Sequence, residues 1–293
     1  MSFLSTRPTF VGVSREPVYS PGKVEADRAV LEETARACEE RGALVRLLTP
    51  DAAPEAFAGS HLVFAMCQGP RALQTLRLLS GAGVPVIHEA PAIESCHRTR
   101  MLPLLSRAGV PRPQARMVTS GDPEPDALAW VAARRGAGVW IKRGDVHATQ
   151  AGDVICVQDE GAARDALAHL AERGVTSAVL EAHVPGRTLK FYGVRGTGFF
   201  RAFEEDGSEA WPTPDGLAVL SDRAAAALDL AVYGGDFVVD GTGRTVVVDM
   251  NDWPSFGRCR ADAAPAIADH LFSRLTESPA MRAPSSPCAR SPL

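Results

Sequence analysis

The chain has 293 residues and a formal net charge of −4 at pH 7. This length allows a large buried core and two or three subdomains. The small negative charge gives no indication of bulk affinity for nucleic acid or for an anionic membrane surface. The six cysteines are scattered and form no CxxC pair, which indicates reduced thiols rather than a disulfide framework or a zinc site.

The first seven residues lack an apolar stretch of signal-peptide length, and no apolar run approaches the ~18 residues of a membrane span. We therefore expect a cytoplasmic protein with neither a membrane partner nor a nucleic-acid partner. The sequence leaves the oligomeric state open, with a homodimer among the alternatives.

Strand and helix patterns alternate over the first part of the chain. Strands are predicted over residues 9–13, 44–48, 62–65 and 84–87, and helices over 24–41 and 70–79. This order predicts a parallel sheet with helices on both of its faces. A further helix over 95–108 stops at Gly109. We take residues 1–110 as an N-terminal α/β domain.

Two further units are predicted after Pro113. A central subdomain, 111–185, contains strands over 115–118, 139–142, 154–157 and 178–181 and helices over 125–135 and 161–173. A C-terminal subdomain, 186–276, contains an antiparallel pair over 187–194 and 198–203, a helix over 217–231, a strand hairpin, and a last helix over 263–275. The proline-rich tail, 277–293, is predicted to be disordered.

The hairpin carries the most informative pair of acidic residues in the chain. Asp236 lies in its first strand and Asp249 ends its second, with a turn-rich stretch between them. If residues 242–243 form a two-residue loop, the register places Asp236 opposite Asp249 and also pairs Val238 with Val247. Facing carboxylates destabilise a hairpin unless a cation lies between them.

Asn251 shares the face of Asp249 because side chains alternate along a strand. Two carboxylates and one amide oxygen form an oxygen-only ligand set that suits Mg²⁺, with Mn²⁺ as an alternative. The hairpin alone supports two hypotheses equally: a metal site that holds nucleotide phosphates, or a hairpin with solvated acids on its outer face.

Polar residues upstream of the hairpin are candidate nucleotide contacts, although each also fits an ordinary structural role. Lys142 ends an apolar strand and could reach phosphate oxygens, or it could be a strand-edge lysine. The loop 143–152 could fold over phosphates with His147 and Thr149 as donors, or it could be a plain connection. Arg98 opens a helix, where a cation is unfavourable unless an anion or solvent offsets it.

The segment 181–186 ends a buried strand and then turns sharply. Glu181 and the backbone groups of Ala182, His183 and Val184 could bind an adenine, although the segment also fits a simple turn. Lys190 lies on an alternating strand and faces away from its apolar neighbours. The chain contains no Walker loop and no GxGxxG, GxSxG or HExxH motif, so the corresponding enzyme classes lose their best support.

In this order, the features resemble the ATP-grasp superfamily over about residues 84–272. The resemblance implies an α/β fold in which an N-terminal parallel-sheet domain precedes two α+β subdomains that clamp ATP. It implies a Mg²⁺ site at Asp236, Asp249 and Asn251. It also implies a nucleotide-binding set in which Arg98 and Lys142 contact the phosphates, Glu181, Ala182, His183 and Val184 hold the adenine, and Thr149 and Lys190 complete the site.

Two chemistries fit this nucleotide site. The run from Lys142 through His147 to Thr149 is similar to inositol tris/tetrakisphosphate kinases, and Asp249 stands where most ATP-grasp ligases have Glu. Ligases are nevertheless the larger share of small ATP-grasp proteins. We therefore expect an ATP- and Mg²⁺-dependent carboxylate–amine or carboxylate–thiol ligase that acts through an acyl phosphate. The alternatives are a small-molecule kinase and a nucleotide-binding protein without turnover.

The acceptor is expected to be a small anionic molecule, and His147, Lys190 and Arg258 are the candidate catalytic residues. A polyphosphate acceptor requires a cluster of cations, whereas a carboxylate requires only one or two. The residues that could form such a cluster are Lys23, Arg100, His147, Lys190, Arg258 and Arg260.

Overall fold

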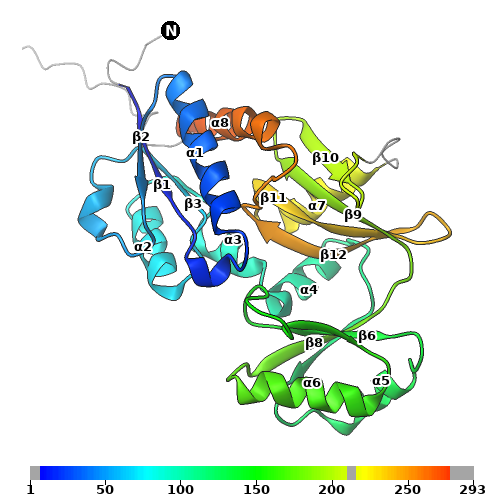
Figure 1. Ribbon diagram of the computed structural model, residues 1–293. Coiled ribbons are helices and arrows are strands. Elements are labelled where there is room, and N and C mark those ends of the chain that lie inside the picture. The colour runs from blue at the N-terminus through cyan, green and yellow to red at the C-terminus, as the bar shows by residue number, and fades with distance from the viewer. Residues whose placement is uncertain (1–6, 210–215, 278–293) are drawn as a thin grey trace, which may run out of the picture.

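The computed structural model describes residues 7–209 and 216–277. Three four-stranded sheets account for the strands of these ranges. Figure 1 shows the first and last parts of the chain side by side, with the central subdomain set apart below them. The tail predicted to be disordered lies outside the described residues from position 278 onward.

The N-terminal sheet is parallel and has the order β2-β1-β3-β4. Its strands are β1 (Thr9–Val13), β2 (Leu44–Leu48), β3 (Leu62–Ala65) and β4 (Val86–Ile87). The helical segments are η1 (Pro17–Tyr19), α1 (Val24–Glu40), η2 (Pro54–Phe57), α2 (Pro70–Gly81) and α3 (Ala90–Ser95). Phe10 and Phe64 pack toward α1, whereas Val11 and Val63 pack toward α2. Helices therefore cover both faces, as predicted.

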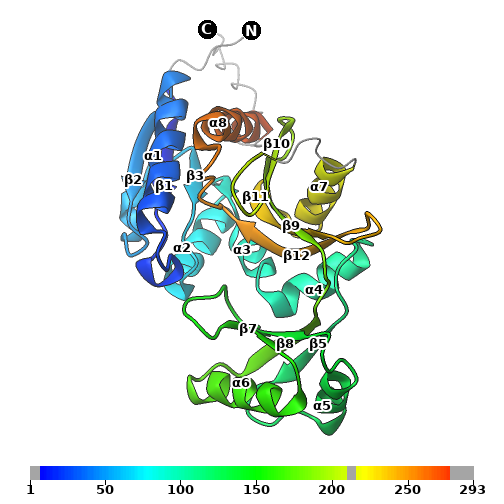
Figure 2. The same ribbon diagram turned by 45° about the vertical axis from the view of Figure 1, so that its right-hand side comes forward.

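The central sheet is antiparallel and has the order β5-β8-β6-β7. Its strands are β5 (Ala115–Thr119), β6 (Val139–Arg143), β7 (Val154–Val157) and β8 (Ser177–Ala182). Its helices α5 (Pro125–Ala132) and α6 (Glu160–Glu172) pack against one face through Leu128, Val131, Leu167 and Leu170. The opposite face is turned toward the rest of the molecule (Figure 2).

The C-terminal sheet is also antiparallel, with the order β10-β9-β11-β12. Its strands are β9 (Arg187–Val194), β10 (Phe199–Phe203), β11 (Val232–Val239) and β12 (Thr245–Asp252). Helices α4 (Arg98–Arg107) and α7 (Leu217–Ala227) cover one face, and α8 (Arg260–Glu277) lies between the other face and α1. The N-terminal and C-terminal sheets consequently share one hydrophobic core.

Two helix predictions need correction. The helix predicted over 95–108 begins later, at Arg98, because His97 has extended backbone before α4, and the short helix α3 over residues 90–95 was not predicted. The helix predicted over 217–231 ends at Ala227, because Asp229 has a positive φ of 56°. Within the described residues, no helix is both long and apolar enough to cross a membrane.

The hairpin has the predicted acid pair but not the predicted register throughout. Asp236 pairs with Asp249, yet Val238 pairs with Val246, so the predicted Val238–Val247 pair is wrong. A β-bulge next to Asp236 shifts the register by one residue. The connection is also longer than two residues, because Asp240 Oδ1 accepts hydrogen bonds from the backbone N–H groups of residues 242 and 244.

His88 joins the N-terminal and C-terminal sheets. It follows β4, is 2% exposed, and its Nε2 accepts hydrogen bonds from the backbone N–H groups of Ala231 (2.9 Å) and Val232 (3.0 Å). Trp253 adds a second link through its indole N–H, which donates to the Ile87 carbonyl at 3.2 Å. Burial lowers the pKa of His88 to about 4, so the folded protein holds this imidazole neutral.

Replacing His88 with Gln keeps a hydrogen-bond acceptor between the two sheets but removes the group that titrates. The unfolded chain binds a proton on His88 below about pH 6.5, whereas the folded protein does so only below about pH 4, so stability is lost as pH falls across this window. We expect His88→Gln to remove up to about 3 kcal/mol of this loss, measured by urea denaturation at several pH values. Burial also lowers the pKa of His97 to about 4. His97 therefore accounts for the pH dependence of stability that remains in the variant.

His169→Gln is the matched control, because His169 is exposed on α6. The free energy of unfolding of His169→Gln should depend on pH as that of the wild type does. If the free energy of unfolding of His88→Gln also kept the wild-type pH dependence, the role of His88 would be contradicted.

Candidate functional site

Two cavities meet at the acid pair of the hairpin. One, of about 460 Å³, lies between the central and C-terminal sheets, and the other, of about 290 Å³, lies between the N-terminal domain and the C-terminal sheet. Arg98, Ala148, Asp236 and Asp249 line both, so the cavities share this wall. We call the larger one the interdomain slot and the smaller one the polar cavity.

The interdomain slot has apolar side walls. Trp140, Val154 and Val184 contribute from the central subdomain, and Val238 and Val248 contribute from the hairpin. The alternation of a strand places Trp140, Val154, Val238 and Val248 on the inner faces of the two sheets, and Val184 follows the end of β8. An apolar slot with a few polar groups at its ends suits an aromatic ring attached to a charged group.

The predicted adenine contacts all line this slot, but their backbone groups are not equally available. The Ala182 N–H donates to the Gln114 carbonyl at 2.8 Å, and the His183 N–H donates to the Gly138 carbonyl at 3.1 Å. Among the hydrogen bonds of the described chain, the Val184 N–H has no partner. Of these three residues, Val184 is therefore the one whose backbone N–H is available to a ligand, and the adenine contact itself stays a prediction.

Lys142 and Glu181 form a buried ion pair inside the slot. Lys142 Nζ donates to Glu181 Oε1 at 2.5 Å and lies 3.4 Å from the Val248 carbonyl. Their side chains are 9% and 4% exposed. Because buried charges require partners, each residue holds the other in place at the slot wall. Lys142 thus lies within the slot, and its partner is one of the predicted adenine-binding residues.

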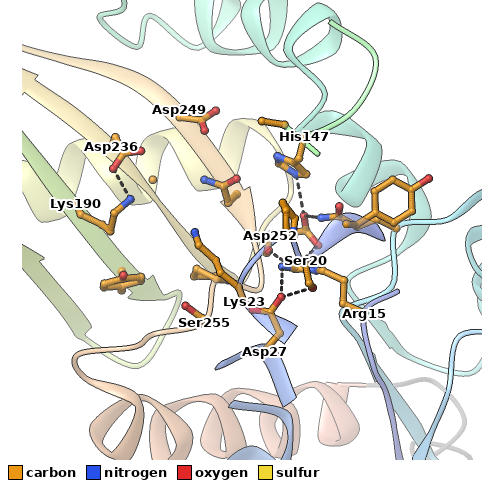
Figure 3. A pocket seen from close by; sticks show the side chains of 18 of the residues that line it. Arg15, Ser20, Lys23, Asp27, His147, Lys190, Asp236, Asp249, Asp252 and Ser255 are labelled. Carbon is orange, nitrogen blue, oxygen red and sulfur yellow. Dashed lines mark hydrogen bonds and ion pairs between the residues drawn. The ribbon is translucent and has the colours of Figure 1, made fainter. Parts of the chain in front are cut away.

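Two of the predicted metal ligands lie in the shared wall, and the third lies beside it in the polar cavity. Asp236 and Asp249 pair across β11 and β12 (Figure 3). Asn251, two residues after Asp249 on β12, lines the polar cavity. Lys190 Nζ donates to Asp236 Oδ1 at 2.7 Å, and Arg98 Nη2 lies 3.5 Å from Asp249 Oδ2. Asp249 Oδ1 is buried with no hydrogen-bond partner among the described residues. This orphaned oxygen within an oxygen-only set fits a hard divalent cation such as Mg²⁺.

The charges around Asp249 keep it ionised. Burial raises the pKa of its carboxyl group, but Arg98, Lys142 and Lys190 lower it by more, so the pKa lies below its usual value. A carboxylate that remains charged at neutral pH is the form that binds a cation.

The loop after β6 reaches over the shared wall. Its residues His147 and Ala148 line the polar cavity. The base of the loop is fixed by Asp153, which is fully buried and accepts hydrogen bonds from the Thr149 N–H (2.7 Å) and hydroxyl (3.1 Å). Arg143 and Arg173 form ion pairs with the same carboxylate. Thr149 therefore belongs to the anchor of the loop and lines neither cavity.

The anchor is strongly ionic. Burial raises the pKa of Asp153, while hydrogen bonds from Thr149 and Arg173 and the charge of Arg143 lower it to about 2 overall. The carboxylate remains charged at any physiological pH, so the loop base keeps its ion pairs.

Sequence reasoning missed the side chains at the far end of the polar cavity. Arg15, Asp27, Gln68 and Asp252 line it, and they come from widely separated parts of the chain. Asp252 Oδ1 accepts a hydrogen bond from Gln68 Nε2 at 2.9 Å and lies 3.4 Å from His147 Nε2. The only sequence signal for this set was the position of Asp252 directly after the metal motif.

Several predicted acceptor-binding cations are not brought to the polar cavity. Arg258 is exposed, donates to the Glu204 carbonyl at 3.0 Å, and lines neither cavity. Arg100 forms an ion pair with Glu94, and Arg260 lies 3.8 Å from Glu33. Of the six predicted cations, the cavity lining contains Lys23, His147 and Lys190.

Comparisons with known proteins identify the fold. No protein-family model and no curated protein matches the chain. Among solved structures, it is similar to a RimK-domain ATP-grasp protein from Sphaerobacter thermophilus, with a TM-score of 0.67 and 22% identity over 90% of this chain and 99% of that one. It is similar to a D-alanine–D-alanine ligase from Bacillus anthracis complexed with ATP, with a TM-score of 0.70 and 13% identity over 92% and 97%.

A third similar structure is the D-cycloserine synthetase DcsG, with a TM-score of 0.67 and 20% identity over 91% of this chain and 99% of that one. These likenesses extend along nearly the whole length of each chain. They agree with the mixed α/β architecture of one parallel and two antiparallel sheets. The chain therefore has the ATP-grasp fold.

Proposed function

We propose that the protein is an ATP- and Mg²⁺-dependent ligase that joins a carboxylate to an amine or thiol through an acyl phosphate. The observation that carries this proposal is the shared wall of Arg98, Ala148, Asp236 and Asp249 between a slot that fits a nucleotide and a separate polar cavity. A phosphoryl group passing between two substrates requires such a junction, with cations and a metal ligand set at the point of transfer. One of the similar structures holds ATP.

Each part of the junction then has a role. The adenine lies between Val238, Val248 and the segment ending at Val184, and Lys142 and Arg98 contact the phosphates. Asp236, Asp249 and Asn251 would hold Mg²⁺, which when bound neutralises phosphate oxygens. The acceptor occupies the polar cavity, where its carboxylate can approach the shared wall. The fixed loop excludes water from the transfer point, which protects an acyl phosphate from hydrolysis.

The charge of the polar cavity supports a ligase over a polyphosphate kinase. Among the described residues that line it, four are basic (Arg15, Lys23, Arg98 and Lys190) and four are acidic (Asp27, Asp236, Asp249 and Asp252). A polyphosphate would meet as many carboxylates as cations, and the repulsion would oppose binding. A substrate with one carboxylate needs only one or two of these cations.

The decisive experiment is a phosphate-release assay with ATP, Mg²⁺ and pooled carboxylic acids, amines, thiols and polyols, followed by mass spectrometry of the products. A condensation product that requires both an acid and a second nucleophile supports the ligase. A polyol that gains one phosphate identifies a kinase instead, and nucleotide binding without turnover on any pool identifies a non-catalytic binder. Either of these results rejects the ligase.

Asp249→Asn should weaken Mg²⁺-dependent nucleotide binding. The substitution removes a charged ligand and leaves Arg98 without its carboxylate partner, so we expect the affinity for ADP with Mg²⁺ to fall by about 10-fold or more. Isothermal titration with and without Mg²⁺ measures the effect. Asp165→Asn, an exposed residue on α6, is the control with the same chemical change. Equal Mg²⁺ dependence in both variants would remove Asp249 from the metal site.

His147→Gln should damage turnover more than nucleotide affinity. His147 lies 3.4 Å from the buried Asp252, which orients its ring toward the polar cavity, where it can accept a proton from the attacking nucleophile. We expect kcat to fall by about 100-fold or more while Kd for ADP changes little. Equal losses of kcat and ADP affinity would contradict this role. His169→Gln again serves as the exposed control.

A further inference from the structure

Three side chains that can bind a metal meet where the loop after β6 reaches the end of β12. Cys96 follows α3, His147 lies in that loop, and Asp252 is the last residue of β12. One donor atom from each, namely the thiol sulfur, a ring nitrogen and a carboxylate oxygen, lies within 4.8 Å of the other two. The chain contains no CxxC pair, so these donors come together only through the fold.

Two of the donor groups are enclosed and have atoms without hydrogen-bond partners. Asp252 is 1% exposed, and its Oδ2 has no partner among the described residues. His147 Nε2 is also buried without one, although it points toward Asp252 and lies 3.4 Å from its Oδ1 (Figure 3). Buried polar atoms without partners cost stability. Both atoms are therefore available to a ligand that enters between them and Cys96.

The mixture of sulfur, nitrogen and oxygen donors selects the metal. Thiolate and imidazole suit Zn²⁺ and related transition metals, whereas Mg²⁺ takes oxygen ligands. Bond lengths of about 2.0–2.3 Å at tetrahedral angles place the donor atoms of a zinc site roughly 3.3–3.6 Å apart. The 3.4 Å between His147 and Asp252 already meets this spacing. Cys96 Sγ, within 4.8 Å of both, must approach by no more than about 1 Å.

The surroundings also suit a divalent cation. A thiolate and a carboxylate together carry the two negative charges that neutralise Zn²⁺, and binding releases the thiol proton to solvent. Arg15 lies 3.9 Å from Asp252 Oδ2, but its charge is paired with Asp27 at 3.2 Å. Its Nη2 donates to the carbonyls of Asp252 and Trp253 instead. His147 and Asp252 both line the polar cavity, which provides the entry route.

We infer that Cys96, His147 and Asp252 form a second metal site, which takes Zn²⁺ or another thiol-binding cation. It shares no ligand with the oxygen-only set at the hairpin. Three protein ligands leave the fourth position of a tetrahedral ion to water. Because the ligands come from the α3–α4 junction, the loop 143–152 and β12, the ion fixes the loop against the body of the molecule.

Metal at this site blocks the role proposed for His147. A neutral imidazole has one nitrogen that accepts and one that carries a proton. With the metal on Nε2, the proton resides on Nδ1, and the ring has no free lone pair with which to accept another. The site is therefore inhibitory. This consequence rests on the proposed function, whereas the metal site itself does not.

Cobalt substitution tests the site on the full chain without nucleotide. Co²⁺ bound to a thiolate has a sulfur-to-metal absorption band in the near ultraviolet, which an oxygen-only site does not give. We expect the wild-type protein to bind Co²⁺ with this band and an equimolar addition of Zn²⁺ to abolish it. Absence of the band, or a band that Zn²⁺ does not displace, overturns the inference.

Variants then locate the ligands. Cys96→Ser should remove the band and weaken Zn²⁺ binding by about 100-fold or more, because loss of a partner one shell further out already costs about 10- to 100-fold. Cys38→Ser, which changes an equally buried thiol on α1, is the control and should keep both the band and the affinity. A band that persists in Cys96→Ser belongs to another thiol and rejects the site.

His147→Gln is the second variant and decides the question if Cys96→Ser does not fold. The His147 side chain is 13% exposed and lies in a loop, so the fold depends on it less than on a core residue. We expect Zn²⁺ affinity to fall by about 10-fold or more. Unchanged affinity in His147→Gln also rejects the site.

Amide hydrogen exchange measures whether the ion fixes the loop. Zn²⁺ should slow exchange over residues 143–152 by about 10-fold or more in the wild type, because opening the loop then requires breaking a metal bond. Exchange in the same segment of Cys96→Ser should not respond to Zn²⁺. No slowing in the wild type, or equal slowing in both proteins, contradicts the link between loop and metal.

The outcomes separate this inference from the proposed function. If no substrate pool gives turnover, the ligase fails, while the cobalt spectra still decide the metal site. If turnover occurs but the band is absent, the ligase stands and the metal site is rejected. If both hold, Zn²⁺ should inhibit the wild type in excess Mg²⁺, and a chelator should restore the rate. Inhibition of Cys96→Ser to the same fraction of its own metal-free rate would reject the inhibitory role.

Discussion

The site depends on one electrostatic constraint: Asp236 and Asp249 face each other on adjacent strands. Such a pair is unfavourable by itself. It is offset by Lys190 from the neighbouring strand, by Arg98 from α4 and by Lys142 from the central sheet. Because these cations come from different parts of the fold, the acids are stabilised only when the subdomains are together. Asp236, Asp249 and Arg98 also belong to the wall between the two cavities.

The facing acids and the order of the three sheets could be predicted from the sequence. The two-residue period of strands places Asp249 and Asn251 on one face, and the register across the hairpin places Asp236 opposite Asp249. The register near the turn could not be predicted, because the bulge and the longer loop are a pair of compensating irregularities. Their effects cancel at the acids, which explains why the pair was predicted correctly although Val238–Val247 was not.

The far end of the polar cavity could not be predicted, because Arg15, Asp27, Gln68 and Asp252 are related only by tertiary structure. Arg15 and Asp252 are 237 positions apart in the chain but share a hydrogen bond. Asp27 lies on α1, where the sequence pattern alone does not distinguish a buried acid from a solvated one. A sequence pattern shows which face of an element is apolar. It does not show which distant carboxylate an arginine will reach.

The common wall has a consequence for how the two ligands influence each other. Arg98, Ala148, Asp236 and Asp249 belong to both cavities, so a ligand that repositions them in one changes the free energy of binding in the other. Thermodynamic reciprocity requires the two ligands to alter each other's affinity by the same factor. Two ligands that reposition this wall are therefore coupled. The saturation curve of each depends on the concentration of the other, without any separate regulatory site.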